Sequence, residues 1–221
     1  MKNSIYKLNK QIVTCEKCPR LASYIRNVAV EKVKRYVQEQ YWGKPLSGFG
    51  DPGAKLLIIG LAPAAHGGNR TGRMFTGDSS GDWVARVLFD NGFATQVSSQ
   101  RIGDGFNLVD AYITAAVKCA PPDNKPSREE INTCSEYLVQ EILLLKNVKV
   151  IVCLGKIAFD TTKQLLGIKH QKFFHGNNFS HDNKIILCSY HPSRQNTQTG
   201  RLSWEQWDKI FRKAKTLLNN Q

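Results

Sequence analysis

Short apolar runs recur along the chain, and each is bounded by residues that favour turns. They cover residues 55–60, 111–117, 149–154 and 184–189. Runs of this length without a polar face are typical of strands buried in a parallel sheet. The pattern therefore predicts four central strands.

Helical spacing of apolar residues fills the intervals between these runs. The clearest helix begins at Ser127, which has capping-box spacing to Glu130 and is followed by an apolar stripe that includes Cys134. A second stripe, beginning at Trp204, is explained by core packing. Strands that alternate with helices predict an α/β protein, a three-layer α/β/α sandwich with a central, mostly parallel four-stranded sheet. Because the chain has 221 residues and no linker or repeat, we expect a single domain, 1–221.

The charge of the chain adds a candidate partner. Thirty-one Lys and Arg against eighteen Asp and Glu give a net charge of +13. Nucleic acid is the polyanion that such a surface suits, although a merely solvated basic surface would have the same composition. No apolar run approaches the ~20 residues that span a bilayer, and the first residues are too polar for a secretory signal. We expect a cytoplasmic protein with no membrane partner.

Six cysteines divide into two groups by their context. Cys153 and Cys188 lie inside apolar runs, where a free cysteine behaves as a small hydrophobic residue. The other four form two pairs about a hundred residues apart: Cys15 with Cys18, and Cys119 with Cys134. In a reducing compartment such clustered thiols are metal ligands or redox centres more often than disulfides. The sequence therefore predicts a metal or iron-sulfur site.

Candidate chemistry lies in the loops after the strands, because open parallel sheets bind ligands outside the carboxyl ends of their strands. The loop GLAPAAHGGNRTGRMFTGDSSGDW, residues 60–83, combines glycines with Arg70 and Arg73, which can hold phosphate, and with Phe75, which can stack on a base. It lacks the signatures of a P-loop and of a dinucleotide fingerprint. Residues 118–126 form a second unusual loop.

The last loop, YHPSRQNTQTGRL, offers a histidine at the end of a buried strand. A lone histidine is usually structural. His191, however, precedes a stiffening proline and lies beside Ser193 and Arg194, which favours a functional role.

These loops and cysteines resemble those of the family 5 uracil-DNA glycosylases, the iron-sulfur branch called type B. The resemblance rests on GLAPAAHGGNRTGRMFTGDSSGDW, on HPSRQNTQTGRL and on four cysteines in the matching order, and it runs from Cys15 to about Leu202. It implies a single α/β/α domain that hydrolyses the N-glycosidic bond of deaminated bases in DNA and so initiates base excision repair. It also implies a 4Fe-4S cluster on Cys15, Cys18, Cys119 and Cys134 that ties down the N-terminal helical segment. A structural zinc is the alternative for four thiolates.

The resemblance also implies roles for residues of the loops. His191 would hydrogen-bond the carbonyl oxygen of the departing base, and Phe75 would stack on the flipped base. Ala62, Asn124 and Ser193 would complete the contacts with the base or sugar. The residues assigned to DNA contact are Arg70, Arg73, Arg194, Gln195, Asn196 and Arg201. Of these, the segment after His191 would enter the minor groove and fill the space that the base leaves.

In other uracil-DNA glycosylases the motif that matches residues 60–63 carries an acidic side chain, and this sequence departs from them there. Leu61 and Ala62 stand there, so the acidic candidates on the loop are Asp78 and Asp82. One of the two can serve as a helix N-cap. We assign the chemistry to Asp78, which would position water or stabilise the sugar cation, and the helix start to Asp82.

A second departure concerns recognition of the base. Family 4 relatives carry an Asn in the strand before the third cysteine, whereas this chain has Ala115, which cannot read the uracil edge. We therefore expect activity on hypoxanthine as well as uracil. Asn124 is either a contact to the base or sugar or only a turn residue.

Three further expectations complete the sequence-based hypothesis. Because no lysine stands out as a Schiff-base nucleophile, the enzyme should be monofunctional. A monomer is the default for a domain that must reach around a duplex. The alternatives are a strict uracil-specific family 4 enzyme and a non-catalytic DNA-binding module stabilised by metal.

Overall fold

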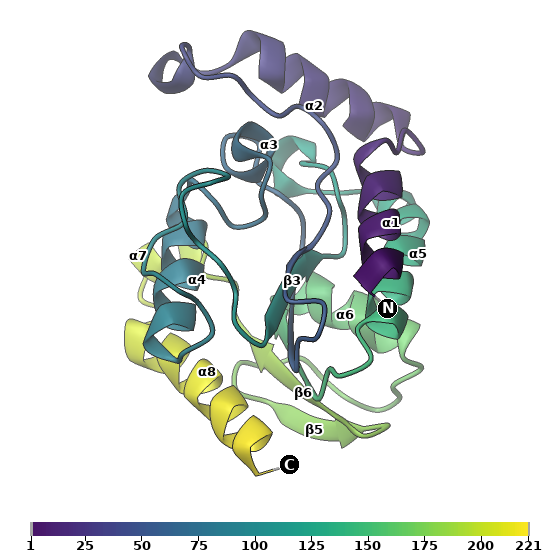
Figure 1. Ribbon diagram of the computed structural model, residues 1–221, viewed down its shortest axis with the longest axis vertical. Coiled ribbons are helices and arrows are strands. Elements are labelled where there is room, and N and C mark those ends of the chain that lie inside the picture. Colours follow the sequence, from purple (N-terminus) through teal and green to yellow (C-terminus); the bar gives the residue numbers. More distant parts are fainter. Residues whose placement is uncertain (1, 221) are drawn as a thin grey trace.

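One six-stranded sheet forms the centre of the computed structural model, which describes residues 2–220 (Figure 1). Its strand order is β1-β3-β2-β4-β6-β5. The strands are β1 (Phe49–Gly50), β2 (Leu56–Gly60), β3 (Ala111–Ala115), β4 (Val150–Leu154), β5 (Asn178–His181) and β6 (Lys184–Ser189). The pairs β2–β3, β2–β4 and β4–β6 are parallel. These four strands match the predicted apolar runs to within two residues at either end.

The predicted count of four strands was wrong, because short antiparallel strands close both edges of the sheet. β1 pairs with β3, and β5 pairs with β6. β1 has only two residues, and β5 alternates exposed with half-buried positions. Neither is an apolar run, so hydrophobic patterning could not reveal them.

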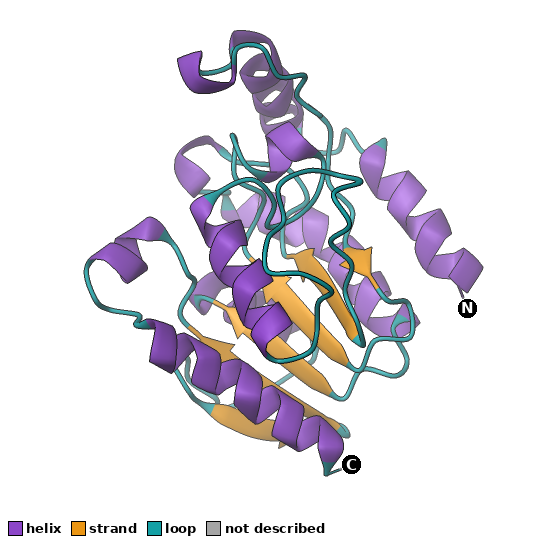
Figure 2. Ribbon diagram, turned by 60° about the vertical axis from the view of Figure 1, so that its left-hand side comes forward, coloured by secondary structure: helices purple, strands orange, loops and turns teal. Residues whose placement is uncertain are grey.

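Helices cover both faces of the sheet, which confirms the three-layer prediction (Figure 2). The helices are α1 (Lys2–Val13), α2 (Pro19–Glu31), α3 (Gly68–Thr71), α4 (Ser79–Asp90), α5 (Arg128–Leu144), α6 (Lys156–Leu165), α7 (Arg194–Gln198) and α8 (Trp204–Asn219), with 3-10 turns η1 (Lys34–Tyr36) and η2 (Pro122–Asn124). Side chains of α4 and α8 form a core on one face, and those of α1, α5 and α6 form a second core on the other. No helix within residues 2–220 is long and apolar enough to cross a membrane.

Both predicted long helices are present, and each begins with a capping box, of which only the one at Ser127 was predicted. Ser127 and Glu130 close a capping box at the start of α5, and Ser203 opens a second box at the start of α8. Trp207 is fully buried on the inner face of α8, where its indole Nε1 donates to the Trp83 carbonyl at 3.2 Å. Core packing therefore accounts for the aromatic stripe. Cys153 and Cys188 are fully buried in the sheet, as predicted for small apolar residues.

A buried ion pair joins the end of β3 to α5. Lys118 Nζ lies 2.7 Å from Glu141 Oε2, with side chains 1% and 0% exposed. Lys118 also donates to the Ala115 carbonyl, and Thr114 Oγ1 donates to Glu141 Oε2 at 2.7 Å. Glu141 Oε1 has no hydrogen-bond partner in the described part of the chain. The pair lies directly before Cys119, so it fixes the strand end that carries this cysteine.

The topology identifies where a ligand should bind. From β2 the chain passes to β3 on one side, and from β4 it passes to β6 on the other. Connections from these neighbouring strands thus leave in opposite directions, and the crevice between their carboxyl ends is the usual ligand position in such sheets.

Candidate active site

His191 lies at this switch point. β2 ends at Gly60, β4 runs into Gly155, and β6 leads through Tyr190 to His191. A Cβ on Gly155 would be 3.6 Å from the Cβ of His191, so the histidine borders the end of β4. The position of His191 directly after a strand was predicted. Its contact with the end of β4 was not, because the sequence does not show which strands are neighbours.

The Phe75 ring covers the end of β2 and faces His191. The two ring centroids are 5.8 Å apart, with 31° between the planes. A Cβ on Gly60 would lie 2.8 Å from Phe75 Cζ, so the ring occupies the space that a side chain at residue 60 would need. Phe75 has a φ of 49°, which is uncommon for a residue other than glycine and costs on the order of 1–3 kcal/mol. The structure thus brings together two predicted site residues that are far apart in sequence.

The backbone after His191 is held by two side chains. Asn196 Nδ2 donates to the His191 carbonyl at 2.8 Å, and Ser80 Oγ at the start of α4 donates to the Pro192 carbonyl at 3.1 Å. Burial lowers the pKa of His191 to about 4. The imidazole is therefore neutral at neutral pH, and it makes no hydrogen bond within residues 2–220. One ring nitrogen can donate to a ligand without first giving up another bond.

A stacked pair of rings supports the residue that precedes His191. Tyr190 and His175 have centroids 5.1 Å apart with 21° between their planes, and the Tyr190 backbone N–H donates to His175 Nδ1 at 3.2 Å. The Arg201 guanidinium lies over Tyr190, 4.6 Å from its centroid. Sequence reasoning missed His175, because it lies in an irregular segment without a motif.

Asp78 is the N-cap of α4. Its Oδ1 accepts the Gly81 backbone N–H at 2.8 Å, and a Cβ on Gly67 would be only 1.8 Å from Oδ2. Burial raises the pKa of Asp78, while hydrogen bonds from the Gly81 and Ser80 N–H groups oppose that rise. The assignment of the helix start to Asp82 was wrong, because this residue is exposed in the first turn and accepts from Gln100 Nε2 at 3.1 Å. The cap and the proposed chemistry thus fall on the same carboxylate.

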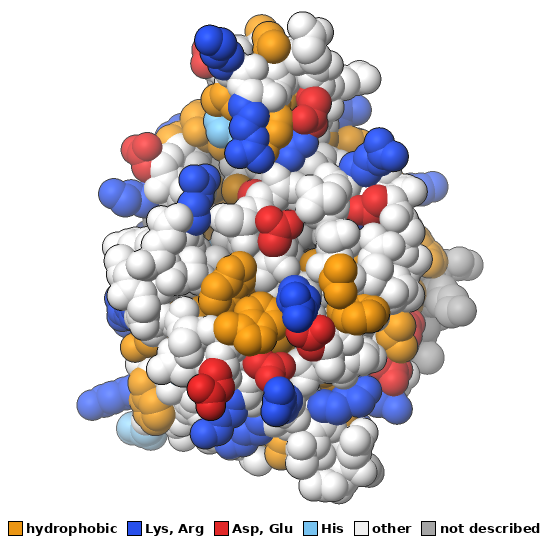
Figure 3. Space-filling model, turned by 90° about the vertical axis from the view of Figure 1, so that its left-hand side faces the viewer, with side chains coloured by type: hydrophobic (Ala, Val, Ile, Leu, Met, Phe, Trp, Pro, Cys, Tyr) orange, Lys and Arg blue, Asp and Glu red, His pale blue; other side chains and the backbone are white. Residues whose placement is uncertain are grey.

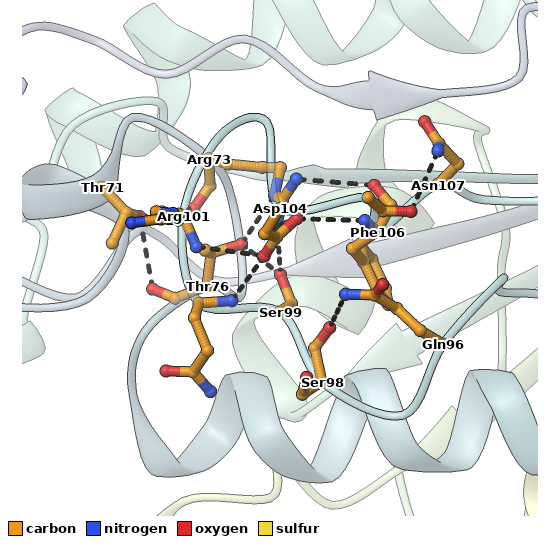
Figure 4. A network of polar contacts seen from close by, with 12 residues as sticks. Thr71, Arg73, Thr76, Gln96, Ser98, Ser99, Arg101, Asp104, Phe106 and Asn107 are labelled. Carbon is orange, nitrogen blue, oxygen red and sulfur yellow. Dashed lines mark hydrogen bonds and ion pairs between the residues drawn. The ribbon is translucent and has the colours of Figure 1, made fainter.

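Two arginines predicted to hold DNA phosphate have internal partners instead. Arg70, 8% exposed, donates to the carbonyls of His66 and Gly77 and pairs with Glu39. Arg73, 10% exposed, binds both carboxylate oxygens of Asp104 at 2.9 and 2.8 Å (Figure 4). Both guanidinium groups thus have structural roles within the protein, and their contact with DNA phosphate stays a prediction.

The segment after His191 divides into internal and exposed side chains. Ser193 caps α7 and accepts from the Asn196 N–H at 3.4 Å, and Asn196 uses its amide on the backbone of His191 as described above. Ser193 and Asn196, which were predicted to contact the substrate or DNA, thus both hydrogen-bond to the backbone of their own segment. Arg194, Gln195 and Arg201 are exposed. On the face seen in Figure 3, Lys and Arg side chains are interspersed with Asp and Glu rather than gathered in one stripe.

The remaining predicted contacts lie on two other loops. Asn124 is exposed in η2 with a φ of 56°, which fits the turn that was the alternative for it. Ala62 is half-buried two residues beyond the end of β2 and packs against the core that α1, α5 and α6 cover.

The four paired cysteines line one cavity between α2, α5 and the end of β3. The cavity is lined by Cys15, Lys17, Cys18, Leu21, Ala22, Pro45, Val117, Lys118, Cys119, Thr133, Cys134 and Tyr137. All four thiols are free of disulfides. The Lys118 backbone N–H donates to Cys134 Sγ at 3.2 Å, and burial raises the pKa of Cys134 to about 11. In residues 2–220, no three His, Cys, Asp or Glu side chains are grouped closely enough to share one metal ion.

At the switch point of this open α/β/α sheet, Phe75 faces a neutral His191, an arrangement of an enzyme site that could hold a planar ring. The chain belongs to the uracil DNA glycosylase superfamily, whose family model matches residues 47–215. Within it the chain belongs to the type-5 group, which confirms the resemblance seen in the sequence.

Relatives match nearly the whole chain. The type-5 uracil-DNA glycosylase of Thermus thermophilus is 43% identical over 93% of this chain and 94% of its own length. That of Mycobacterium leprae is 44% identical over 97% and 96%. A type-4 uracil-DNA glycosylase of Pyrobaculum aerophilum is 30% identical over 86% and 83%. The higher identity to type-5 enzymes argues against the family 4 alternative.

Proposed function

We propose that this protein is a monofunctional DNA glycosylase that hydrolyses the N-glycosidic bond of uracil in DNA and starts base excision repair. The observation that carries the proposal is the approach of Phe75 and His191 at the switch point of the sheet. The relatives, all named uracil-DNA glycosylases, support the same substrate.

His191 has the properties that the departing base requires. As the bond breaks, negative charge develops on the base and positive charge on the deoxyribose. A neutral imidazole can donate a hydrogen bond to the carbonyl oxygen of the base, and a preorganised donor of this kind contributes about 3–4 kcal/mol to the transition state. The low pKa of His191 keeps this donor neutral throughout the physiological range. Phe75 would stack on the extruded base and hold it in plane with that donor.

Asp78 suits the other side of the reaction. The burial that raises the pKa of Asp78 also keeps water away from its carboxylate. Because attraction between opposite charges is stronger where water is excluded, the ionised carboxylate would stabilise positive charge that develops on the sugar. The carboxylate accepts the Gly81 N–H through Oδ1, and its Oδ2 would orient a water molecule. The Gly67 position leaves room for that oxygen.

The substrate range should extend beyond uracil. Ala115, at the end of β3, is buried in the core beside α4 and offers no hydrogen-bonding side chain. Leu61 and Ala62 likewise bring no polar group to the end of β2. A site without a bidentate reader of the base edge discriminates weakly, because no buried polar group is left unpaired by a different base. Hypoxanthine is therefore included in the proposal.

The four cysteines that line one cavity would hold a 4Fe-4S cluster. A single zinc ion would require all four sulfurs at about 2.3 Å from one point. The cavity that the four disulfide-free thiols share and the N–H···S bond to Cys134 support the cluster, with a structural zinc as the alternative. When bound, the cluster supplies a covalent cross-link and no electron-transfer step. It would join α2 to α5 and to the strand end at Cys119.

Exposed side chains beyond His191 would contact DNA. Arg194 and Gln195 project from α7, and Arg201 remains exposed above Tyr190. The loop that carries them lies next to the proposed base site, which supports a place in the minor groove. We include in the proposal a monomer that works in the prokaryotic cytoplasm.

Single-turnover assays on duplexes with one uracil, one hypoxanthine or one mismatched thymine test the proposal. Wild-type protein should release uracil and hypoxanthine, with strand breaks appearing only after alkaline treatment. His191→Ala and Asp78→Asn should each lower the rate by about 100-fold or more, whereas the control Asp82→Asn should not. Full activity of both site variants would show that the reaction uses other residues.

A further inference from the structure

A polar network lies beneath the turn that carries Phe75. Arg73 Nη2 donates to Ser99 Oγ at 2.8 Å as well as to Asp104, and Arg73 Nε donates to Thr76 Oγ1 at 3.0 Å. Thr76 Oγ1 and Ser99 Oγ are 2.7 Å apart. Figure 4 shows these side chains converging from residues 71–76 and from the loop 96–107. The two segments are thus fixed to each other by side chains of both.

Asp104 organises the second segment. Its carboxylate accepts backbone N–H groups from Gln100 at 2.7 Å, Arg101 at 3.1 Å and Phe106 at 3.0 Å, besides the guanidinium of Arg73. Burial alone would raise the pKa of Asp104, but these N–H groups and Arg73 hold it far below its usual range. The carboxylate therefore stays ionised and keeps the loop closed on Arg73.

Phe75 stands between the two residues that this network holds. Arg73 precedes it by two positions and buried Thr76 follows it directly. The Gly77 N–H, one residue further, donates to the Ser99 carbonyl at 2.9 Å. A left-handed backbone such as that of Phe75 persists only where the surroundings over-determine it. The bonds on both sides of Phe75 meet that condition.

We propose that Arg73, Thr76, Ser99 and Asp104 form a positioning network that holds Phe75 in its left-handed conformation and so sets its ring against the extruded base. The inference rests on the proposed function and assigns a role in base holding to residues 98–106, which no motif had singled out. None of the four residues needs to contact the substrate. Their effect on the reaction passes through Phe75.

A double-mutant cycle tests this route. Asp104→Asn keeps the shape of the side chain but weakens its bond to Arg73, and Phe75→Ala removes the ring. Asp104→Asn should lower the single-turnover rate on a uracil duplex by about tenfold, within the range that base stacking supports. In the Phe75→Ala background the same change should alter the rate by less than about twofold, because no ring remains to be positioned.

Two readouts separate positioning from general damage. Affinity for a duplex that already contains an abasic site should be unchanged in Asp104→Asn, since this product has no base to stack. Asp90→Asn, which disrupts the exposed Arg86–Asp90 pair of α4, is the matched control and should keep the wild-type rate. If Asp104→Asn does not fold, Thr76→Val replaces it, because it preserves shape and removes only the hydroxyl group in the network.

The outcomes are distinct. Equal rate losses in the wild-type and Phe75→Ala backgrounds, or no loss in either, would overturn the positioning role. A wild-type rate in Phe75→Ala alone would overturn it as well, while leaving the glycosylase activity established. If wild-type protein excised no base, the proposed function itself would fail before any variant was compared.

Discussion

A methyl group at residue 60 should displace the ring of Phe75. In Gly60→Ala the new Cβ would lie 2.8 Å from Phe75 Cζ and 3.0 Å from Cε2, whereas its distance to the Thr114 carbonyl oxygen would be an ordinary 3.7 Å. Carbon atoms prefer separations of about 3.5–4.0 Å, so the ring must move by roughly 1 Å. A misplacement of about 1 Å in a site that depends on orientation can cost about 100-fold in rate.

The fold itself should tolerate this change. Overpacking costs about 1–3 kcal/mol, and loss of glycine freedom in the unfolded chain returns about 0.4–1 kcal/mol. The free energy of unfolding should therefore fall by only about 0–2.6 kcal/mol, which is small against typical stabilities of about 5–15 kcal/mol. A large loss of rate in a protein that remains folded would thus report the position of the ring.

The assay is single-turnover excision of uracil from a duplex, with thermal unfolding of each variant measured in parallel. Gly53→Ala, in the turn before β2, is the matched control, because its Cβ would lie 3.3 Å from Asp51 Oδ1 and no closer than 3.9 Å to the other two neighbouring atoms, Asn147 Nδ2 and Asp51 Cγ. It should excise uracil at the wild-type rate. The reasoning would be refuted if Gly60→Ala excised uracil at the wild-type rate and its thermal unfolding showed a folded protein. The position of the Phe75 ring could then not govern the reaction.

Three further predictions concern protonation, the helix cap and the cysteines. Because the folded pKa of His191 is about 4, below the unfolded value of about 6.5, its neutral form contributes stability that is fully present above pH ~6.5 and is lost as the pH falls toward 4. His191→Gln should flatten the melting temperature over that window, and wild-type excision should show no inflection near pH 6.5 from this group. Asp78→Asn should keep or raise the melting temperature, since Asn also caps helices and the desolvated charge is removed, while excision falls by about 100-fold or more; a parallel loss of both would contradict the separation of the two roles. Purified protein should be brown and contain iron and sulfide, and Cys134→Ser should lose the colour and make the segment before β1 sensitive to protease; a colourless protein with one zinc per chain would refute the cluster.

Patterning predicted the elements that depend on burial alone. The four parallel strands are continuous apolar runs, and the start of α5 is marked by a serine cap with its partner three residues later. Phe75 and His191 could be assigned to one site because loops after parallel strands converge at one edge. The edge strands escaped because main-chain pairing, rather than side-chain pattern, creates them.

The type of a charged residue does not predict which group within the protein it will pair with. Arg70 and Arg73 suit phosphate chemically, but each found an internal acceptor through a contact that the motif does not encode. Asp78 and Asp82 are equivalent as acids, and only the register of α4 decides which one caps it. Asp104 lies in a stretch of ordinary polar residues, so nothing in the sequence singled it out as a centre of the loop.

The buried pair of Lys118 and Glu141 constrains how this sequence can change over generations. Replacing either residue alone leaves the other charge buried without a partner, at a cost of about 3–5 kcal/mol, a large share of the roughly 5–15 kcal/mol that stabilises a typical domain. Replacing both with apolar residues of similar volume is often neutral or stabilising. Two viable sequences are therefore separated by unstable single steps. In a random mutant library selected for function, we expect both positions to be unchanged or both to be altered together.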